Sequence, residues 1–235
     1  MEHQTNRFSQ ASQKYPDLFS MTREESIYIA EKLKADSIWR SARLEGIPVT
    51  YADTETILEG ILPNKSNVGV VGVIAIVNLK HAWDFILDIL DTPTSFQILS
   101  QVNSILGQSN LIMDAGKLRS FQVSLGGTFW IPAIPDYSVI QTALSEIFSK
   151  GTVTEQAMRL MLFCMRIQPF SDGNKRSATL LANHHLLRHG AGLLTIPAEV
   201  LSEFKTGLIR FYETNDYDPI MEFLYSKCIR GIVRT

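Results

Sequence analysis

The segment TEQAMRLMLFCMRIQPFSDGNKRSATLLANHHLLR, residues 154–188, contains two helical patterns separated by a short loop. Apolar residues recur at helical spacing in its first half, and Pro169 ends that pattern because proline cannot donate to the helical hydrogen-bond ladder. Asp172 and Gly173 then place a capping carboxylate and a flexible residue at the start of a second helix, near Asn174. The segment therefore predicts a helix–loop–helix unit.

Helical patterns also account for most of the remaining chain. Thr22 and Glu25 form a capping box at the start of the first predicted helix, and Gly46 marks its end. Residues 68–77, VGVVGVIAIV, are rich in β-branched residues that favour a strand, but the apolar spacing continues to Leu90 and favours one buried helix. The predicted helices cover residues 22–46, 50–58, 68–90, 95–106, 139–148, 154–167, 174–188, 197–214 and 219–229.

One β-hairpin is predicted between Leu118 and Pro132. The stretches RSFQVS and TFWIP flank Leu125, Gly126 and Gly127, and the glycines permit the positive φ of a tight turn. Apolar residues alternate along both stretches, and a ribbon of two strands is marginal by itself, so it must lean on the helices. The predicted fold class is an all-α bundle with one β-hairpin.

Length and composition fit one globular domain. The 235 residues are 45% hydrophobic and 20% charged, and 22 Lys and Arg against 24 Asp and Glu give a formal net charge of -2. This balance argues against a nucleic-acid partner held by bulk positive charge, and the two cysteines have no metal-ligand spacing. The first residues lack the apolar core of a signal peptide, and the longest apolar run is too short to span a bilayer. We expect a cytoplasmic protein without a membrane or nucleic-acid partner, built from an N-terminal arm (1–20) and a single domain (21–235).

The loop between the two central helices has the residues of a phosphate site. The first turn of a helix exposes unpaired amides at the positive end of its dipole and so attracts anions. Lys175 and Arg176 add two cations at that turn, and Asp172 offers a carboxylate that can hold a Mg²⁺ bridging phosphates. The other interpretation is an ordinary helix cap followed by two solvated basic residues, which spacing alone favours.

The loop sequence QPFSDGNKR, residues 168–176, resembles the signature of the Fic/Doc family, His-Pro-Phe-x-Asp-Gly-Asn-(Gly/Lys)-Arg. Proteins of this family are all-α and typically transfer AMP from ATP to a hydroxyl of a target protein, whereas Doc-like members transfer a phosphoryl group. The resemblance implies a Fic fold in which the predicted hairpin is a flap that aligns a target segment by strand addition. Thr128, Phe129 and Trp130 would then contact the target protein.

The resemblance also implies roles for the loop residues. Asp172 would coordinate Mg²⁺ on the phosphates of ATP. Gly173 and Asn174 would offer backbone amides to the phosphates and to the charge that develops during transfer. Arg176 would hold a terminal phosphate, and Lys175 would line the same cradle. ATP and Mg²⁺ are therefore the expected ligands.

Two positions depart from the family pattern. Gln168 stands where the family has the histidine that accepts the proton of the attacking hydroxyl, and a glutamine amide can position a hydroxyl but cannot accept its proton. Because losing a general base typically costs about 10²- to 10⁴-fold in rate, we expect AMP transfer to be weakened. Thr179 stands where transferring members usually carry a second arginine, and together with Lys175 it makes the loop closer to the Doc-type pattern.

The stretch SARLEG at the end of the first predicted helix matches the inhibitory pattern of the family, Ser/Thr-x-x-x-Glu-Gly/Asn, with Ser41 and Glu45 as its marked residues. In relatives this glutamate enters the nucleotide site, pairs with the second arginine and blocks productive seating of the γ-phosphate. Because Thr179 removes that partner, Glu45 would pair with Lys175 or Arg176 instead. The alternative is a solvated helix end stopped by a glycine.

These observations predict a Fic-like ATP-binding protein related to protein AMP transferases, an adenylyltransferase whose chemistry is impaired by Gln168. A Doc-like protein kinase and a non-catalytic nucleotide- and partner-binding module are the alternatives. The expected partner is a target protein that docks on the hairpin, and self-association into a homo-oligomer stays open.

Overall fold

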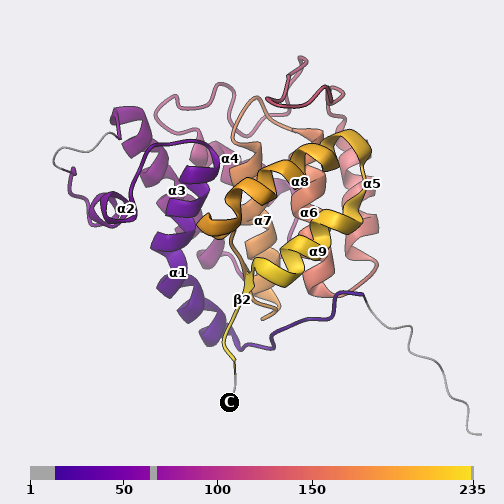
Figure 1. The fold of residues 1–235 in the computed structure, drawn as a ribbon, viewed down its shortest axis with the longest axis horizontal. Helices are drawn as coiled ribbons and strands as arrows, with labels where there is room; N and C mark the ends of the chain where they lie inside the picture. The colour runs from indigo at the N-terminus through magenta and orange to yellow at the C-terminus, as the bar shows by residue number, and fades with distance from the viewer. Residues whose placement is uncertain (1–13, 64–67, 234–235) are drawn as a thin grey trace, which may run out of the picture.

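The helices of the predicted central unit, α6 (Val153–Ile167) and α7 (Asn174–Arg188), pack against each other in the computed structural model (Figure 1). The structure describes residues 14–63 and 68–233. α7 is buried along almost its whole length. It is therefore the helix around which the rest of the chain is arranged.

The remaining helices cover this pair from two sides (Figure 1). The elements are α1 (Arg23–Leu44), α2 (Tyr51–Leu58), α3 (Val70–Asp88), α4 (Phe96–Leu106), α5 (Tyr137–Phe148), the short 3₁₀ helix η1 (Ala198–Val200), α8 (Leu201–Thr214) and α9 (Tyr217–Lys227). α1, α3 and α4 pack on α7, whereas α5 and α9 pack on α6 and α8 lies on α9. The all-α fold class predicted from the sequence is confirmed.

The local signals for the helices act as predicted. In the capping box of α1, the Thr22 hydroxyl accepts from the amide of Glu25 (3.2 Å) and the Glu25 carboxylate accepts from the amide of Thr22 (2.8 Å). Thr50 and Asp53 form a second capping box at the start of α2. The segment predicted as 197–214 is divided into η1 and α8.

The ambiguous apolar run at residues 68–77 belongs to a helix. Ile76, Leu79 and Trp83 of α3 are almost completely buried and face the core that α1, α4 and α7 share. Tertiary packing therefore overrides the β propensity of the branched residues. By length and composition α3 could cross a membrane, so the expectation that no run is long enough was wrong, because the apolar helix continues beyond residue 77; the core helix of a soluble protein satisfies the same criterion.

The predicted β-hairpin is wrong in its strand pairing. Residues 118–132 have neither helix nor strand, with a bend at Phe121 and a turn at Gly126 and Gly127, so the two stretches of this described segment do not pair as strands. The two-stranded sheet of the described chain instead joins β1 (Leu193–Leu194) to β2 (Ile229–Arg230). In place of a ladder, the guanidinium of Arg119 joins the two ends of the segment, because it donates to the carbonyls of Phe121, Pro132 and Ala133. We call residues 120–134 the flap segment.

The described part of the N-terminal arm is held against the domain. The amide of Thr154 donates to the Asp17 carboxylate (2.7 Å), and the Tyr225 hydroxyl donates to the carbonyl of Pro16 (3.0 Å). Tyr15 is buried. Residues 1–13 of the predicted arm lie outside the described residues.

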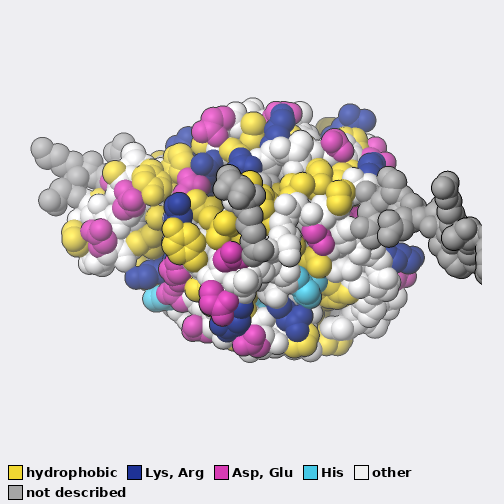
Figure 2. All heavy atoms as spheres, turned by 90° about the horizontal axis from the view of Figure 1, so that it is seen from below, with side chains coloured by type: hydrophobic (Ala, Val, Ile, Leu, Met, Phe, Trp, Pro, Cys, Tyr) yellow, Lys and Arg dark blue, Asp and Glu magenta, His cyan; other side chains and the backbone are white. Residues whose placement is uncertain are grey.

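The surface toward the lower edge of Figure 1 carries mixed charge. Figure 2 shows acidic and basic side chains interspersed across this face, with hydrophobic side chains between them. This distribution agrees with the formal net charge of -2. The cations that matter for a phosphate site are those concentrated at one helix end, described next.

Candidate functional site

The loop between α6 and α7 contains two residues with left-handed backbone. Gln168 (φ 49°) ends α6, and Gly173 (φ 75°) immediately precedes α7. A Cβ atom at position 173 would lie 2.7 Å from Cδ1 of Ile112 and 2.9 Å from Nδ2 of Asn103, so glycine alone fits without a shift. Nδ2 of Asn103 also donates to the carbonyl of Asp172 (2.9 Å), which fixes the turn from α4.

The side chains of Gln168 and Asn174 close the loop on itself. Nδ2 of Asn174 donates to Oε1 of Gln168 (3.0 Å) and to the carbonyl of Phe170 (2.9 Å), while its Oδ1 accepts from the amide of Phe170 (2.9 Å). Nε2 of Gln168 donates to the carbonyl of Met165 (2.5 Å). Gln168 and Asn174 are both buried. The carboxamide of Gln168 is therefore engaged at both its ends by atoms of the loop and of α6.

α1 brings a carboxylate over the first turn of α7. Glu45 caps α1, with Oε2 3.3 Å from Nζ of Lys175 and Oε1 4.0 Å from Nε of Arg176. Nη2 of Arg176 lies 3.5 Å from Oδ1 of Asp172. Oε1 of Glu45 and Nε of Arg176 are buried without a hydrogen-bond partner among the described residues. Such atoms are costly to bury, so this ion cluster is favourable for a ligand or water that completes its hydrogen bonds.

A cleft of about 460 Å³ lies beside the ion cluster. Glu45, Asp172 and Arg176 form its charged rim. Its apolar wall comprises Ile47, Pro48, Val68, Val71, Ala75 and Leu111. The volume falls in the range of small-molecule sites, about 300–1,000 Å³. The sequence interpretation missed this wall, although the glycines that interrupt the run VGVVG were a signal, because each removes a side chain at the start of α3.

Comparison with known proteins identifies the domain that carries this site. The family model described as Fic/DOC family matches residues 93–186, which include α4, α5, α6 and most of α7. This segment is a Fic/DOC domain. The signature resemblance seen in the sequence is thereby confirmed at the level of the family.

The curated relatives of this chain are distant. It is 25% identical over 182 residues to protein adenylyltransferase fic-1 of Caenorhabditis elegans. The alignment covers 73% of this chain and 35% of the relative. The protein of the same description from Caenorhabditis briggsae is 25% identical over 189 residues, with the same coverages of 73% and 35%. The chain thus spans about a third of the length of these relatives.

Solved structures share the fold. A Fic domain containing signaling protein from Bacteroides thetaiotaomicron superposes with a TM-score of 0.70 at 23% identity, covering 88% of this chain and 86% of that chain. Fic-1 (aa134 - 508) from C. elegans gives a TM-score of 0.70 at 18% identity, covering 88% of this chain and 63% of that chain. At these identities the likeness establishes the Fic fold alone.

In this Fic/DOC domain the tip of the flap segment, residues 128–130, has one anchored and one free aromatic residue. The guanidinium of Arg166 lies over the Trp130 ring, 3.7 Å from its centroid, and the indole N–H points to the Arg166 carbonyl (3.5 Å). The Thr128 hydroxyl donates to the Glu213 carboxylate (3.1 Å). Phe129, between them, is 98% exposed. Thr128 and Trp130 therefore hold the tip on the domain, and Phe129 is the member of the predicted target-contact trio that faces solvent.

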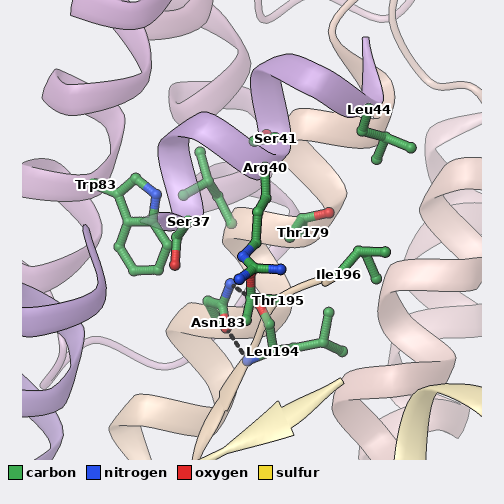
Figure 3. A pocket seen from close by; sticks show the side chains of 11 residues that line it. Ser37, Arg40, Ser41, Leu44, Trp83, Thr179, Asn183, Leu194, Thr195 and Ile196 are labelled. Atoms are coloured by element: carbon green, nitrogen blue, oxygen red, sulfur yellow. Dashed lines mark hydrogen bonds between the residues drawn. The ribbon is translucent and has the colours of Figure 1, made fainter. Parts of the chain in front are cut away.

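Ser41 and Thr179 lie away from the ion cluster, at the joint between α1 and α7 (Figure 3). They line a small cavity of about 20 Å³ into which Arg40 extends from α1. That volume is enough for about one water molecule. The Thr179 hydroxyl donates to the carbonyl of Lys175 (2.9 Å). The joint fixes α1 against α7 one turn from the residues that Glu45 contacts.

Proposed function

We propose that this Fic/DOC protein binds ATP with Mg²⁺ at the first turn of α7 and is related in activity to protein AMP transferases, with transfer weakened by Gln168. The observation that supports this most is that two cations lie at the first turn of α7: Arg176, at the rim of a cleft of about 460 Å³, and the adjacent Lys175, which with Arg176 faces Glu45. Two cations and unpaired amides at one point favour a polyphosphate. The apolar wall of the cleft favours a ligand with a flat, weakly polar part beside its phosphates.

The donors near the turn fit a magnesium ion carried by the nucleotide. The described residues contain no group of three His, Cys, Asp or Glu side chains that could hold a metal by themselves. Asp172 is 65% exposed and offers one carboxylate beside the cations. Mg²⁺ is usually bound through one or two carboxylates, substrate phosphates and water, so this set is sufficient. When bound, the ion would neutralise phosphate charge.

The proposed transfer explains why Gln168 matters. The oxygen of a target hydroxyl attacks the α-phosphorus, the bond from that phosphorus to the β-phosphate oxygen breaks, and pyrophosphate leaves. The hydroxyl proton must pass to a base, and the Gln168 carboxamide accepts no proton near neutral pH. That carboxamide is also hydrogen-bonded to Met165 and Asn174, so few of its donors and acceptors are left to orient a hydroxyl.

The ion cluster supports a further element of the proposal, inhibition by Glu45. Its carboxylate lies against Lys175 and Arg176, the cations assigned to the phosphates. A nucleotide polyphosphate would compete with Glu45 for them. The exposed Phe129 and the flap segment support docking of a target protein there.

Isothermal titration calorimetry and labelled nucleotides test the proposal together. MgATP should bind the unmodified protein, and Lys175→Ala should weaken binding several-fold, whereas Lys150→Ala, at an exposed position, should not. Incubation of Gln168→His with ATP labelled at the α or the γ position should leave α-label on protein. Absence of any heat with MgATP would refute nucleotide binding, and absence of α-label from Gln168→His combined with Glu45→Gly would refute the weakened transferase.

Two other functions are outcomes of the same experiment. Retention of label only from the γ-phosphate would indicate a Doc-like kinase, which Lys175 and Thr179 favour. MgATP binding with neither label would indicate a non-catalytic nucleotide-binding module. The engaged carboxamide of Gln168 is the observation that favours the module.

A further inference from the structure

Arg119 is a buried cation whose partners are all backbone carbonyls. The residue is 4% exposed, and no carboxylate pairs with it in the part of the chain that the structure describes. Burial accordingly lowers the pKa of its guanidinium from the ordinary value. A charge in such a position requires compensation from dipoles that point at it.

One group of carbonyls comes from the end of α6. Nε of Arg119 donates to the carbonyl of Gln168 (2.7 Å), and Nη2 donates to that of Ile167 (3.2 Å). The backbone amide of Arg119 donates to the carbonyl of Pro169 (3.0 Å). The last carbonyls of a helix are unpaired and form the negative end of its dipole, so they are suited to hold this cation.

The second group comes from both ends of the flap segment. Nη1 donates to the carbonyl of Phe121 (2.6 Å), and Nη2 donates to those of Pro132 (3.3 Å) and Ala133 (2.5 Å). A guanidinium presents five N–H donors in one rigid plane, whereas a lysine ammonium has three on a single atom. The Arg119 side chain makes five such contacts at once, whereas a lysine has at most three donors, all on one atom.

We propose that Arg119 is a positioning residue that couples the base of the flap segment to the backbone of the signature loop at Gln168. The functional consequence of this coupling rests on the proposed function. A target bound on the flap segment would be aligned with the loop position at which its hydroxyl reacts. The turn that precedes α7, where we place the nucleotide phosphates, has a support that does not involve Arg119, because Asn103 of α4 binds Asp172 and Ser177. Loss of Arg119 should therefore weaken the alignment of the acceptor hydroxyl and leave nucleotide binding almost unchanged.

The decisive variant is Arg119→Lys, with Arg210→Lys on the exposed face of α8 as the matched control. We combine each with Gln168→His and follow AMP transfer to a target or to the chain itself. Arg119→Lys should raise the KM for the acceptor about tenfold or more, while the KM for ATP and the affinity for MgATP change less than threefold. If Arg119 had a merely structural role, the variant would impair acceptor binding and nucleotide binding to the same extent. Equal effects on acceptor and nucleotide, or no effect on either, would overturn the coupling.

A second measurement tests the coupling without any transfer activity. Hydrogen exchange of Arg119→Lys should become at least tenfold faster in residues 120–134 and in 167–170 together, with α9 unchanged. Millimolar methylguanidinium should restore protection in Arg119→Ala by occupying the vacated space. Faster exchange in residues 120–134 alone would refute the inference even if MgATP binds. If Gln168→His transfers no label but exchange is coupled, the proposed function fails and the positioning contact stands.

Discussion

Replacing Glu45 with glutamine should make MgATP bind more tightly. The carboxylate lies 3.3 Å from the Lys175 ammonium and 4.0 Å from the Arg176 guanidinium, and these are the cations that we assign to the phosphates. A nucleotide that uses them must first displace Glu45. The free energy of that displacement is subtracted from the binding free energy, and Glu45→Gln removes most of it while keeping the side-chain shape.

The magnitude follows from the geometry. At an effective dielectric constant of about 20, unit charges 3.3 Å apart attract by about 5 kcal/mol. Desolvation and the partial exposure of Lys175 (31%) reduce this, so we take about 1.5–3 kcal/mol, the range for a hydrogen bond to a charged group. Since about 1.4 kcal/mol corresponds to a tenfold change, the Kd for MgATP should fall by about 10- to 100-fold.

Calorimetric titration of MgATP into the unmodified protein, Glu45→Gln and Glu59→Gln measures this. Glu59 caps α2 in the same way that Glu45 caps α1, but it lies outside the ion cluster. The gain for Glu45→Gln should shrink at higher salt, because added ions screen the pair. A Kd within twofold of the unmodified protein, or an equal gain for Glu59→Gln, would refute the competition between Glu45 and the nucleotide.

Three further predictions concern the loop, the core and the flap segment. Gly173→Ala should lower the free energy of unfolding by about 1–3 kcal/mol in thermal unfolding, because its φ is 75° and the added Cβ would lie 2.7 Å from Ile112. The control Gly60→Ala, with φ 81° and no atom within 4 Å of the added Cβ, should lower it less. Burial lowers the pKa of His185 to about 3 from 6.5, so the unfolded chain binds a proton that the folded chain refuses. Stability should fall as pH decreases from about 6.5 toward 3, by up to about 1.4 kcal/mol per pH unit, and urea unfolding of His185→Gln should show a shallower decline. Phe129→Ser should leave the melting temperature unchanged, since the ring is 98% exposed, yet reduce labelling of a docked target; an unchanged labelling rate would place the target elsewhere.

The helices could be predicted from the sequence because their signals are local. The capping box of Thr22 and Glu25 involves residues three positions apart, and Pro169 directly follows Gln168, the C-cap of α6. The turn at Gly173 could likewise be predicted from adjacent residues. A Fic-type signature then identified the loop, because it depends on contiguous residues.

The contacts that complete the site are not local, and sequence spacing carries no signal for them. Arg119 reaches the carbonyl of Gln168 across 49 positions, and Asn103 reaches that of Asp172 across 69 positions. The strand prediction for the flap segment failed for a different reason. Alternating residues and a glycine turn favoured a ribbon, but they carry no signal that the neighbouring Arg119 side chain binds the carbonyls of Phe121, Pro132 and Ala133.

Different residues support the two ends of the signature loop. Asn103 fixes the turn at Asp172 from α4, and Arg119, immediately before the flap segment, fixes the backbone at Gln168. One side-chain hydrogen bond, from Nδ2 of Asn174 to Oε1 of Gln168, joins the two ends (3.0 Å). Because Asn103 holds the turn that precedes α7 without using Gln168, the weak transfer and the nucleotide binding that we propose are compatible in one chain.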